Sequence, residues 1–256
     1  MSELITRQEG QVLEVIFNRP AQRNAMTWAM YDGLYDACER ADASDDIRVM
    51  TLRGAGEDAF VAGTDIGQFS SFETGADGVA YEAKIERIVD RLERVRVPTV
   101  AIVRGYCVGG GLALAAACDL RVATHDARFG VPIARTLGNC LSMNTYSLLV
   151  HHLGPARTLD LLLRARLLSG DDACSAGFVA EVCAADRLDA VAAEVVERLL
   201  RHAPLSMWAA KEAVRRLRKA ALPDGDDLVT TVFGSADFHN AVAAFLAKQR
   251  PTWEGR

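Results

Sequence analysis

The sequence lacks the features that mark membrane, metal-binding and nucleic-acid-binding proteins. No apolar run reaches the roughly 18–20 residues that a membrane-spanning helix needs, and residues 1–10 hold no apolar signal-peptide core. The five histidines form no H-x-x-x-H or H-E-x-x-H pattern, so no metal site is expected. The 34 acidic residues outnumber the 29 basic ones, which disfavours a basic surface for nucleic acid. We therefore expect a cytoplasmic protein with no metal, membrane or nucleic-acid partner.

Disulfides are also not expected. None of the six cysteines forms a C-x-x-C pair, most of them lie in apolar runs, and the chain is longer than the small secreted proteins that depend on disulfides. Half of the 256 residues are hydrophobic, which is enough to bury a sizeable core in one large domain or two small ones.

Strand-like and helix-like runs alternate through the first half of the chain. We expect strands at 12–17, 47–53, 99–103 and 120–123, and helices at 27–42 and 79–95. Alternation of this kind predicts an α/β fold with right-handed crossovers. The second half reads as mostly helical, with helices expected at 148–168, 169–177, 187–203, 205–221 and 235–249. Two polar stretches, 70–78 and 223–227, are expected to be loops.

Two segments rich in small residues are suited to binding a ligand with the main chain. Residues 60–66 follow a strand and a turn, and residues 105–111 bring three consecutive glycines to the start of a helix-like run. Small residues let a ligand approach the backbone, and a helix start leaves N–H groups without partners. Two such donors could polarise one carbonyl oxygen; the alternative is that each segment is only a tight turn. A dinucleotide site is not indicated, because its glycine pattern would need glycine at Leu114.

Five stretches, in order, resemble the motifs of the crotonase superfamily, the enoyl-CoA hydratase/isomerase family. They are N-R-P with R-N-A at 18–20 and 23–25, A-G-T-D-I at 62–66, G-Y-C-V-G-G-G with C-D at 105–119, F-G-V-P at 129–132, and F-L-A-K-Q-R-P at 245–251. The resemblance covers essentially the whole chain. It implies a crotonase-like spiral of β-β-α turns with a helical C-terminal region. We expect residues 1–200 to form the acyl-CoA-binding core, and residues 201–256 to serve oligomerisation and closure over CoA.

The resemblance implies that an acyl-CoA thioester places its carbonyl oxygen between the backbone N–H groups of Thr64 and Gly110. Removing one such donor typically costs roughly 2.7–4 kcal/mol of transition-state stabilisation. Asp65 is expected to fix its loop by accepting hydrogen bonds. No separate cofactor is expected, because coenzyme A is part of the substrate, and the family assembles as homotrimers or hexamers.

Further ligand contacts are implied at or near the same motifs. The expected substrate- and CoA-binding residues are Arg23, Asn24, Ala25, Ala62, Asp65, Ile66, Gly109, Cys140 and Lys248. Arg23 and Lys248 are expected to meet CoA phosphates, whereas solvated surface charge is the alternative for both. Cys140 is expected to line the acyl pocket rather than to act as a nucleophile, because no neighbouring base is visible.

The chain departs from the family at two positions. Hydratases of the family carry two glutamates, and Ala113 and Ile133 stand in those places, so neither position can transfer a proton. Glu82 is the best substitute, because it lies at the edge of an apolar helical stripe where its pKa would be raised; a surface ion pair is the alternative. The reaction therefore stays open between hydration, a double-bond shift, decarboxylation and thioester hydrolysis. An acyl-CoA-binding protein without activity is a further alternative, and RNA binding is disfavoured by the net charge.

Overall fold

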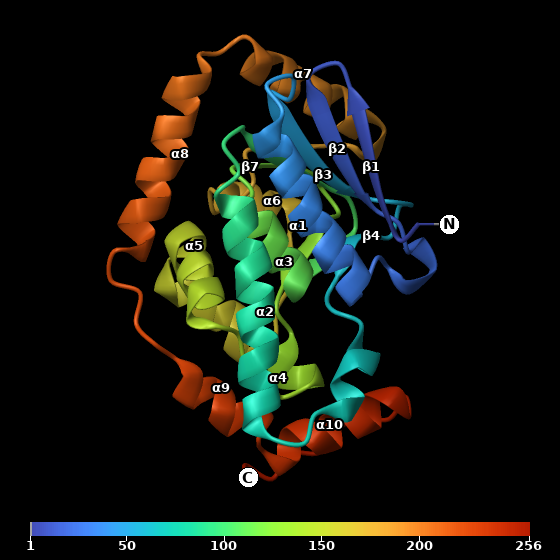
Figure 1. Ribbon diagram of the computed structural model, residues 1–256. Coiled ribbons are helices and arrows are strands. Elements are labelled where there is room, and N and C mark those ends of the chain that lie inside the picture. The colour runs from blue at the N-terminus through green and yellow to red at the C-terminus, as the bar shows by residue number, and fades with distance from the viewer. Residues whose placement is uncertain (1) are drawn as a thin grey trace.

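The computed structural model describes residues 2–256 and contains two sheets (Figure 1). The larger sheet has the order β1-β2-β3-β5-β7-β10, and the smaller has the order β4-β6-β8-β9. The larger sheet consists of β1 (Leu4–Glu9), β2 (Val12–Phe17), β3 (Val49–Gly54), β5 (Thr99–Val103), β7 (Leu120–Thr124) and β10 (Glu181–Cys183). The smaller sheet consists of β4 (Ala59–Ala62), β6 (Tyr106–Val108), β8 (Arg128–Gly130) and β9 (Leu168–Ser169). All pairs are parallel except β1–β2 and β8–β9.

Three successive turns build the spiral. In each turn one strand joins the larger sheet, the next strand joins the smaller sheet, and a helix follows. The helices are α1 (Trp28–Ala43), α2 (Gly75–Glu93), α3 (Gly110–Ala117), α4 (Ile133–Thr136), α5 (Met143–Leu163), α6 (Gly170–Ser175), α7 (Leu188–Leu200), α8 (Pro204–Lys219), α9 (Asp226–Phe233) and α10 (Ala236–Leu246), with 3₁₀ turns η1 (Pro20–Gln22), η2 (Ile66–Ser71) and η3 (Ala185–Arg187). The predicted α/β spiral with a helical C-terminal region is confirmed.

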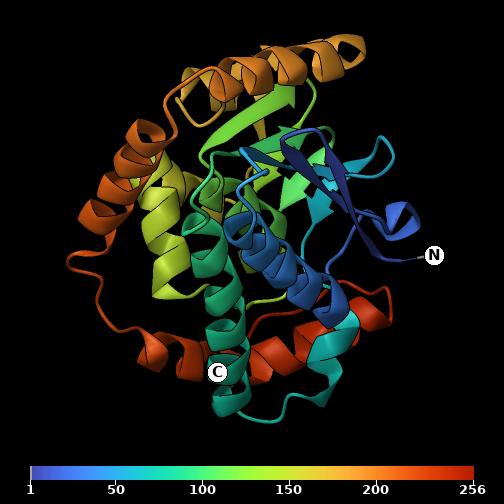
Figure 2. The ribbon, with the colours of Figure 1, turned by 45° about the horizontal axis from the view of Figure 1, so that its top comes forward.

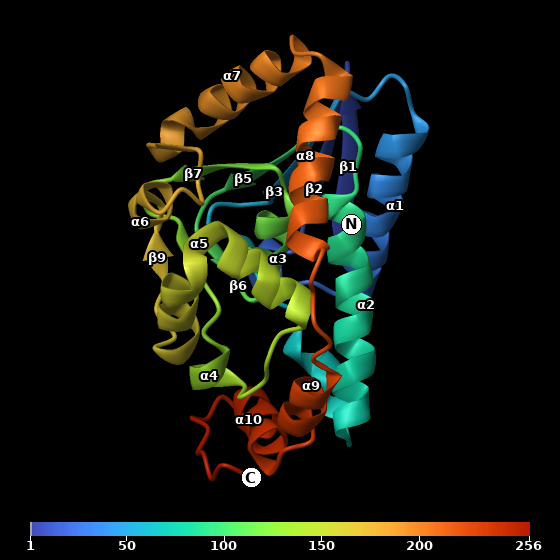
Figure 3. The ribbon, with the colours of Figure 1, turned by 90° about the vertical axis from the view of Figure 1, so that its left-hand side faces the viewer.

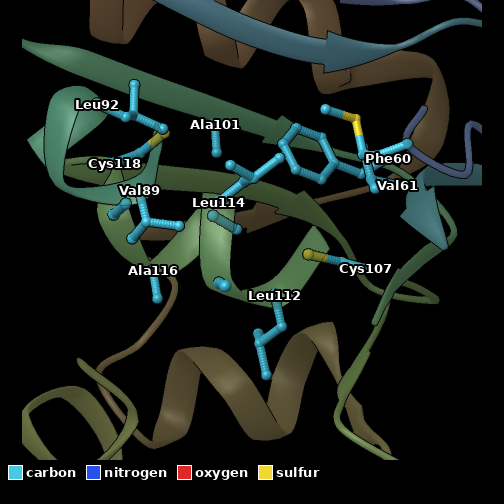
Figure 4. Close-up of a cluster of buried hydrophobic side chains, with 14 of the residues drawn as sticks. Phe60, Val61, Val89, Leu92, Ala101, Cys107, Leu112, Leu114, Ala116 and Cys118 are labelled. Atoms are coloured by element: carbon cyan, nitrogen blue, oxygen red, sulfur yellow. The ribbon is translucent and has the colours of Figure 1, made fainter. Parts of the chain in front are cut away.

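Helix α3 forms the centre of the main core. Its sequence is apolar on every side, and residues from Gly111 to Ala117 are buried, as expected for a helix surrounded by protein. Leu112, Leu114 and Ala116 lie among side chains from both sheets and from α2 (Figure 4). A smaller apolar cluster joins the larger sheet to α7.

The C-terminal helices lie at two ends of the molecule. Helix α7 lies across one end, and α8 leads from it to α9 and α10 at the other (Figure 3). There α10 lies beside η2 (Figure 2), and the rings of Phe69 and Phe238 meet with centroids 5.9 Å apart. The C-terminal region therefore covers the segment that follows β4.

Several boundaries differ from the expectation. Helix α2 begins at Gly75 rather than at 79, because Thr74 and Asp77 cap it reciprocally. Helix α5 begins at Met143 rather than at 148, because Ser142 accepts a hydrogen bond from the N–H of Thr145. Strand β1 was not expected, and α9 begins within the stretch expected to be a loop.

The cysteines are free thiols, as expected. Within residues 2–256, no helix is long and apolar enough to cross a bilayer. The same residues form no group of three or more His, Cys, Asp or Glu side chains suited to a metal ion.

Candidate functional site

The two small-residue segments meet where neighbouring strands end. Strands β4 and β6 are paired in parallel, so the loops that follow them leave the same edge of the sheet. A Cβ added at Gly109 would lie 3.5 Å from Cα of Gly63, and one added at Gly110 would lie 3.4 Å from Oγ1 of Thr64. Gly63 and Gly109 have φ values of +89° and +55°, which favour glycine. The fold thus brings Thr64 and Gly110 close together.

Among residues 2–256, no backbone carbonyl accepts a hydrogen bond from the N–H of Thr64 or from that of Gly110. In the bridge between Met26 and Thr64, the N–H of Met26 donates to Gly63 O and the N–H of Asp65 donates to Met26 O, both at 2.9 Å. The N–H of Thr64 itself therefore points away from this bridge. Gly110 is the first residue of α3, so its N–H has no acceptor within the helix. Both groups are available to a ligand.

Thr64 and Gly110 lie on the wall of one cavity of about 200 Å³. Most of its wall is apolar and includes Ile66, Phe69, Ile85, Val108, Ala113 and Ile133. No Lys, Arg or His side chain is present among the described lining residues. Because a cavity of about 150 Å³ accommodates benzene, this one has room for a short acyl group. The two positions where the resemblance implies glutamates are thus part of the wall, but they are apolar.

Glu82 supplies the one carboxyl group of the described cavity wall. It is 6% exposed, and its Oε2 accepts a hydrogen bond from the N–H of Ser142 at 2.9 Å. Burial raises its pKa to about 8, with the Ser142 N–H opposing the rise and the Glu86 carboxylate adding to it. The group is therefore predominantly a neutral acid at pH 7. The expected raised pKa agrees with this buried position, and the hydrogen-bond donor to Glu82 within residues 2–256 is a backbone N–H rather than a surface cation.

Three hydroxyl groups form a chain that sequence reasoning missed. Thr64 Oγ1 lies 2.9 Å from the Tyr31 hydroxyl and 2.8 Å from the Tyr81 hydroxyl. Burial raises the pKa of both tyrosines. Tyr81 lies in the apolar helical stripe that the sequence shows, but the stripe alone does not reveal its polar partner.

Asn24 and Asp65 hold the loops together. Asn24 is fully buried, its Oδ1 accepts from the N–H of Arg19, and its Nδ2 donates to the carbonyls of Ala55 and Ala59. Asp65 accepts from the Arg19 guanidinium at 3.0 Å and from the N–H of Gly67 at 3.2 Å, as expected for a residue that fixes its loop. The side-chain amide of Asn24 therefore binds backbone groups of this protein, and the expected contact of Asn24 with CoA stays a prediction.

The other predicted contacts divide into two groups. Ala62, Ile66 and Gly109 line the cavity. Arg23, Ala25 and Lys248 lie outside its wall, and the exposed Arg23 guanidinium stacks over the ring of Tyr106.

Cys140 lies between two residues that line the cavity, Asn139 and Leu141, but its own thiol is directed elsewhere. Its thiol lies 3.9 Å from the carbonyl oxygen of Leu228 on α9, and the residue is outside the cavity wall. Burial raises the pKa of this thiol to about 12, so it is also unsuited to nucleophilic attack. The physical reason is its position in the buried contact between the 137–142 segment and α9.

Comparisons with known proteins agree over the whole chain. The model of a family described as enoyl-CoA hydratase/isomerase matches residues 7–256. The chain is 32% identical over 260 residues to a 2,3-dehydroadipyl-CoA hydratase of Escherichia coli (strain K12), with 100% of each chain covered. A solved enoyl-CoA hydratase/carnithine racemase from Magnetospirillum magneticum is 31% identical, with a TM-score of 0.82 and coverage of 100% of this chain and 97% of that one. A methylmalonyl-CoA decarboxylase in complex with 2-nitronate-propionyl-CoA shares the fold at 23% identity, with a TM-score of 0.90 and coverage of 100% and 99%.

Proposed function

The chain belongs to the enoyl-CoA hydratase/isomerase family, and on that premise we propose that it processes a short acyl-CoA thioester in the cavity beside Thr64 and Gly110. The thioester oxygen accepts hydrogen bonds from these two N–H groups. Charge that develops on this oxygen in an enolate-like transition state is then stabilised by donors that need no rearrangement. The observation that carries the proposal is that both residues lie on one cavity wall, where neither N–H group has a backbone acceptor among residues 2–256.

Glu82 is the proton-transfer group in this proposal. Ala113 and Ile133 supply none, and Glu82 is the one carboxyl group in the described wall. With a pKa of about 8 it exchanges protons readily near neutral pH. Its hydrogen bond to the Ser142 N–H fixes one oxygen and leaves the other for the substrate.

Coenzyme A is treated as part of the substrate, with no separate cofactor. Lys248 follows Phe245, which lines the cavity, and both Lys248 and Arg23 are exposed cations suited to phosphate groups outside it. A homotrimer or hexamer is part of the same proposal. It is supported by exposed apolar side chains on α8, namely Leu205, Trp208, Val214 and Leu217.

A second candidate is an acyl-CoA-binding protein without catalytic activity. The apolar side chains of Ala113 and Ile133 favour it, because they replace the proton-transfer groups that the resemblance implies. A decarboxylase or thioesterase would use the same pair of N–H groups, because both reactions also place charge on the thioester oxygen.

The discriminating experiment follows exchange of the α-protons of butyryl-CoA in D₂O by proton NMR, alongside calorimetric titration of binding. We expect the protein to bind butyryl-CoA and to catalyse exchange. Glu82→Gln should bind with similar affinity and lose exchange. Glu86→Gln is the matched control, because Glu86 lies one turn along α2 and is outside the cavity wall.

Each alternative outcome has a distinct meaning. Failure to bind any acyl-CoA overturns the proposal. Binding without exchange by the unmodified protein indicates the silent binding protein. Full exchange by Glu82→Gln removes Glu82 from the mechanism.

A further inference from the structure

The hydroxyl chain formed by Tyr31, Thr64 and Tyr81 holds one more hydrogen than it can use internally. Three hydroxyl groups carry three O–H hydrogens, but the chain contains only two contacts, at 2.9 and 2.8 Å. Each contact uses one hydrogen. Within residues 2–256 neither tyrosine hydroxyl has another hydrogen-bond partner. One O–H donor is therefore left over.

The position of Tyr31 decides where this donor lies. Tyr31 is 1% exposed and is not part of the cavity wall. Its hydroxyl abuts the backbone of Gly110, where an added Cβ would lie 2.8 Å from it. A hydrogen left unpaired at this place would be buried without an acceptor, which is costly. Tyr31 therefore donates to Thr64.

The surplus hydrogen then belongs to the cavity side of the chain. If Thr64 accepts from Tyr31 and donates to Tyr81, each hydroxyl polarises the next, an arrangement favoured in hydrogen-bond chains. The O–H of Tyr81 remains free, and Tyr81 lines the cavity beside Glu82. We propose that Tyr81 is a specificity-determining residue whose O–H binds a neutral oxygen on the acyl group of the substrate.

The geometry indicates where the recognised oxygen lies on the substrate. The Tyr81 hydroxyl lies 2.8 Å from Oγ1 of Thr64. In the proposed function, the N–H of the same threonine donates a hydrogen bond to the thioester oxygen. The recognised oxygen is therefore close to the thioester. We assign it to a keto or hydroxyl group two carbons from the thioester carbon. A carboxylate of the substrate at this position is disfavoured, because the described wall offers no cation to balance its charge.

This inference rests on the proposed function, and the test separates the two. The probes are acetoacetyl-CoA, which carries a keto oxygen at this position, and butyryl-CoA, which lacks it. Calorimetric titration gives the ratio of their dissociation constants. The unmodified protein should favour acetoacetyl-CoA, and Tyr81→Phe should reduce this preference roughly threefold to tenfold, the usual effect of one net hydrogen bond. Affinity for butyryl-CoA should stay unchanged.

Two further variants test the hydroxyl chain rather than the aromatic ring of Tyr81. Thr64→Val removes the central hydroxyl and should reduce the preference, whereas Thr64→Ser should keep it. Tyr35→Phe removes a hydroxyl from α1 outside the cavity wall and is the matched control.

An unchanged ratio in Tyr81→Phe overturns the inference, and so does an equal loss of affinity for both probes, which would show a packing role. Failure of the unmodified protein to bind either probe overturns the proposed function itself.

Discussion

The buried carboxyl group of Glu82 makes stability depend on pH in a way that Glu82→Gln should abolish. Below its ordinary pKa of 4.5 the group is protonated in both the folded and the unfolded chain. Between 4.5 and about 8 the unfolded chain ionises while the folded chain holds the proton. Unfolding then releases a proton, so the free energy of unfolding falls as pH rises, and the loss is complete above about 8.

The magnitude follows from the same two pKa values. At 1.36 kcal/mol per pH unit, the interval from 4.5 to about 8 corresponds to roughly 5 kcal/mol of lost stability. Of this loss of stability, roughly 3–4 kcal/mol falls between pH 5 and pH 8. The glutamine side chain does not titrate. The free energy of unfolding of Glu82→Gln, relative to that of the unmodified protein, should therefore rise by this amount from pH 5 to pH 8.

The assay is urea unfolding of both proteins at pH 5 and pH 8, at one protein concentration, followed by tryptophan fluorescence. Other titrating groups are common to both proteins and cancel in the difference. The pH-independent cost of the substitution also cancels. If the two stability profiles run parallel from pH 5 to pH 8, Glu82 is not a buried acid with a raised pKa, and the reasoning is refuted.

Substitutions at Asn24, at two glycines and at Arg218 test the scaffold, each measured by urea unfolding. Asn24→Ala removes three hydrogen bonds of a fully buried amide and should cost roughly 3–5 kcal/mol. A loss below about 1 kcal/mol would contradict its structural role. Gly111→Ala would place a Cβ 2.1 Å from a backbone oxygen and should prevent folding. Gly154→Ala meets no clash but keeps φ of 73° and ψ of 162°, a region essentially restricted to glycine, so it should cost about 1–3 kcal/mol. Arg218→Ala leaves Glu93 buried without its partner and should cost about 3–5 kcal/mol. The double variant Arg218→Met with Glu93→Leu removes both charges and should cost less.

The elements that the sequence predicts well are those with a strong apolar pattern. Helix α3 is apolar throughout, and strand β5 is apolar after Thr99. Segments of this kind are stable only when they are buried in the core. Strand β1 was missed because it is an edge strand with exposed polar side chains from Thr6 to Glu9. Helix α9 was missed because its contact with α2, where Gly75 meets the carbonyl of Thr230, is a tertiary property.

The same distinction applies to the site. The two small-residue segments are each continuous in sequence, and the resemblance to the family implied the pairing of Thr64 with Gly110. The hydroxyl chain joins residues 33 and 17 positions apart, and no sequence spacing signals such a contact. The structural role of Asn24 could not be predicted, because a buried amide that bridges backbone groups and an amide that binds a ligand look alike in a motif.

The central claim is that the N–H groups of Thr64 and Gly110 donate hydrogen bonds to the thioester oxygen. Infrared difference spectroscopy of bound butyryl-CoA, with and without ¹³C at the thioester carbon, reports on this oxygen directly. Two hydrogen bonds polarise the carbonyl, so its stretching band should move to lower frequency than in water and should sharpen. A band at the frequency of free butyryl-CoA in water, from a fully bound sample, would contradict the account.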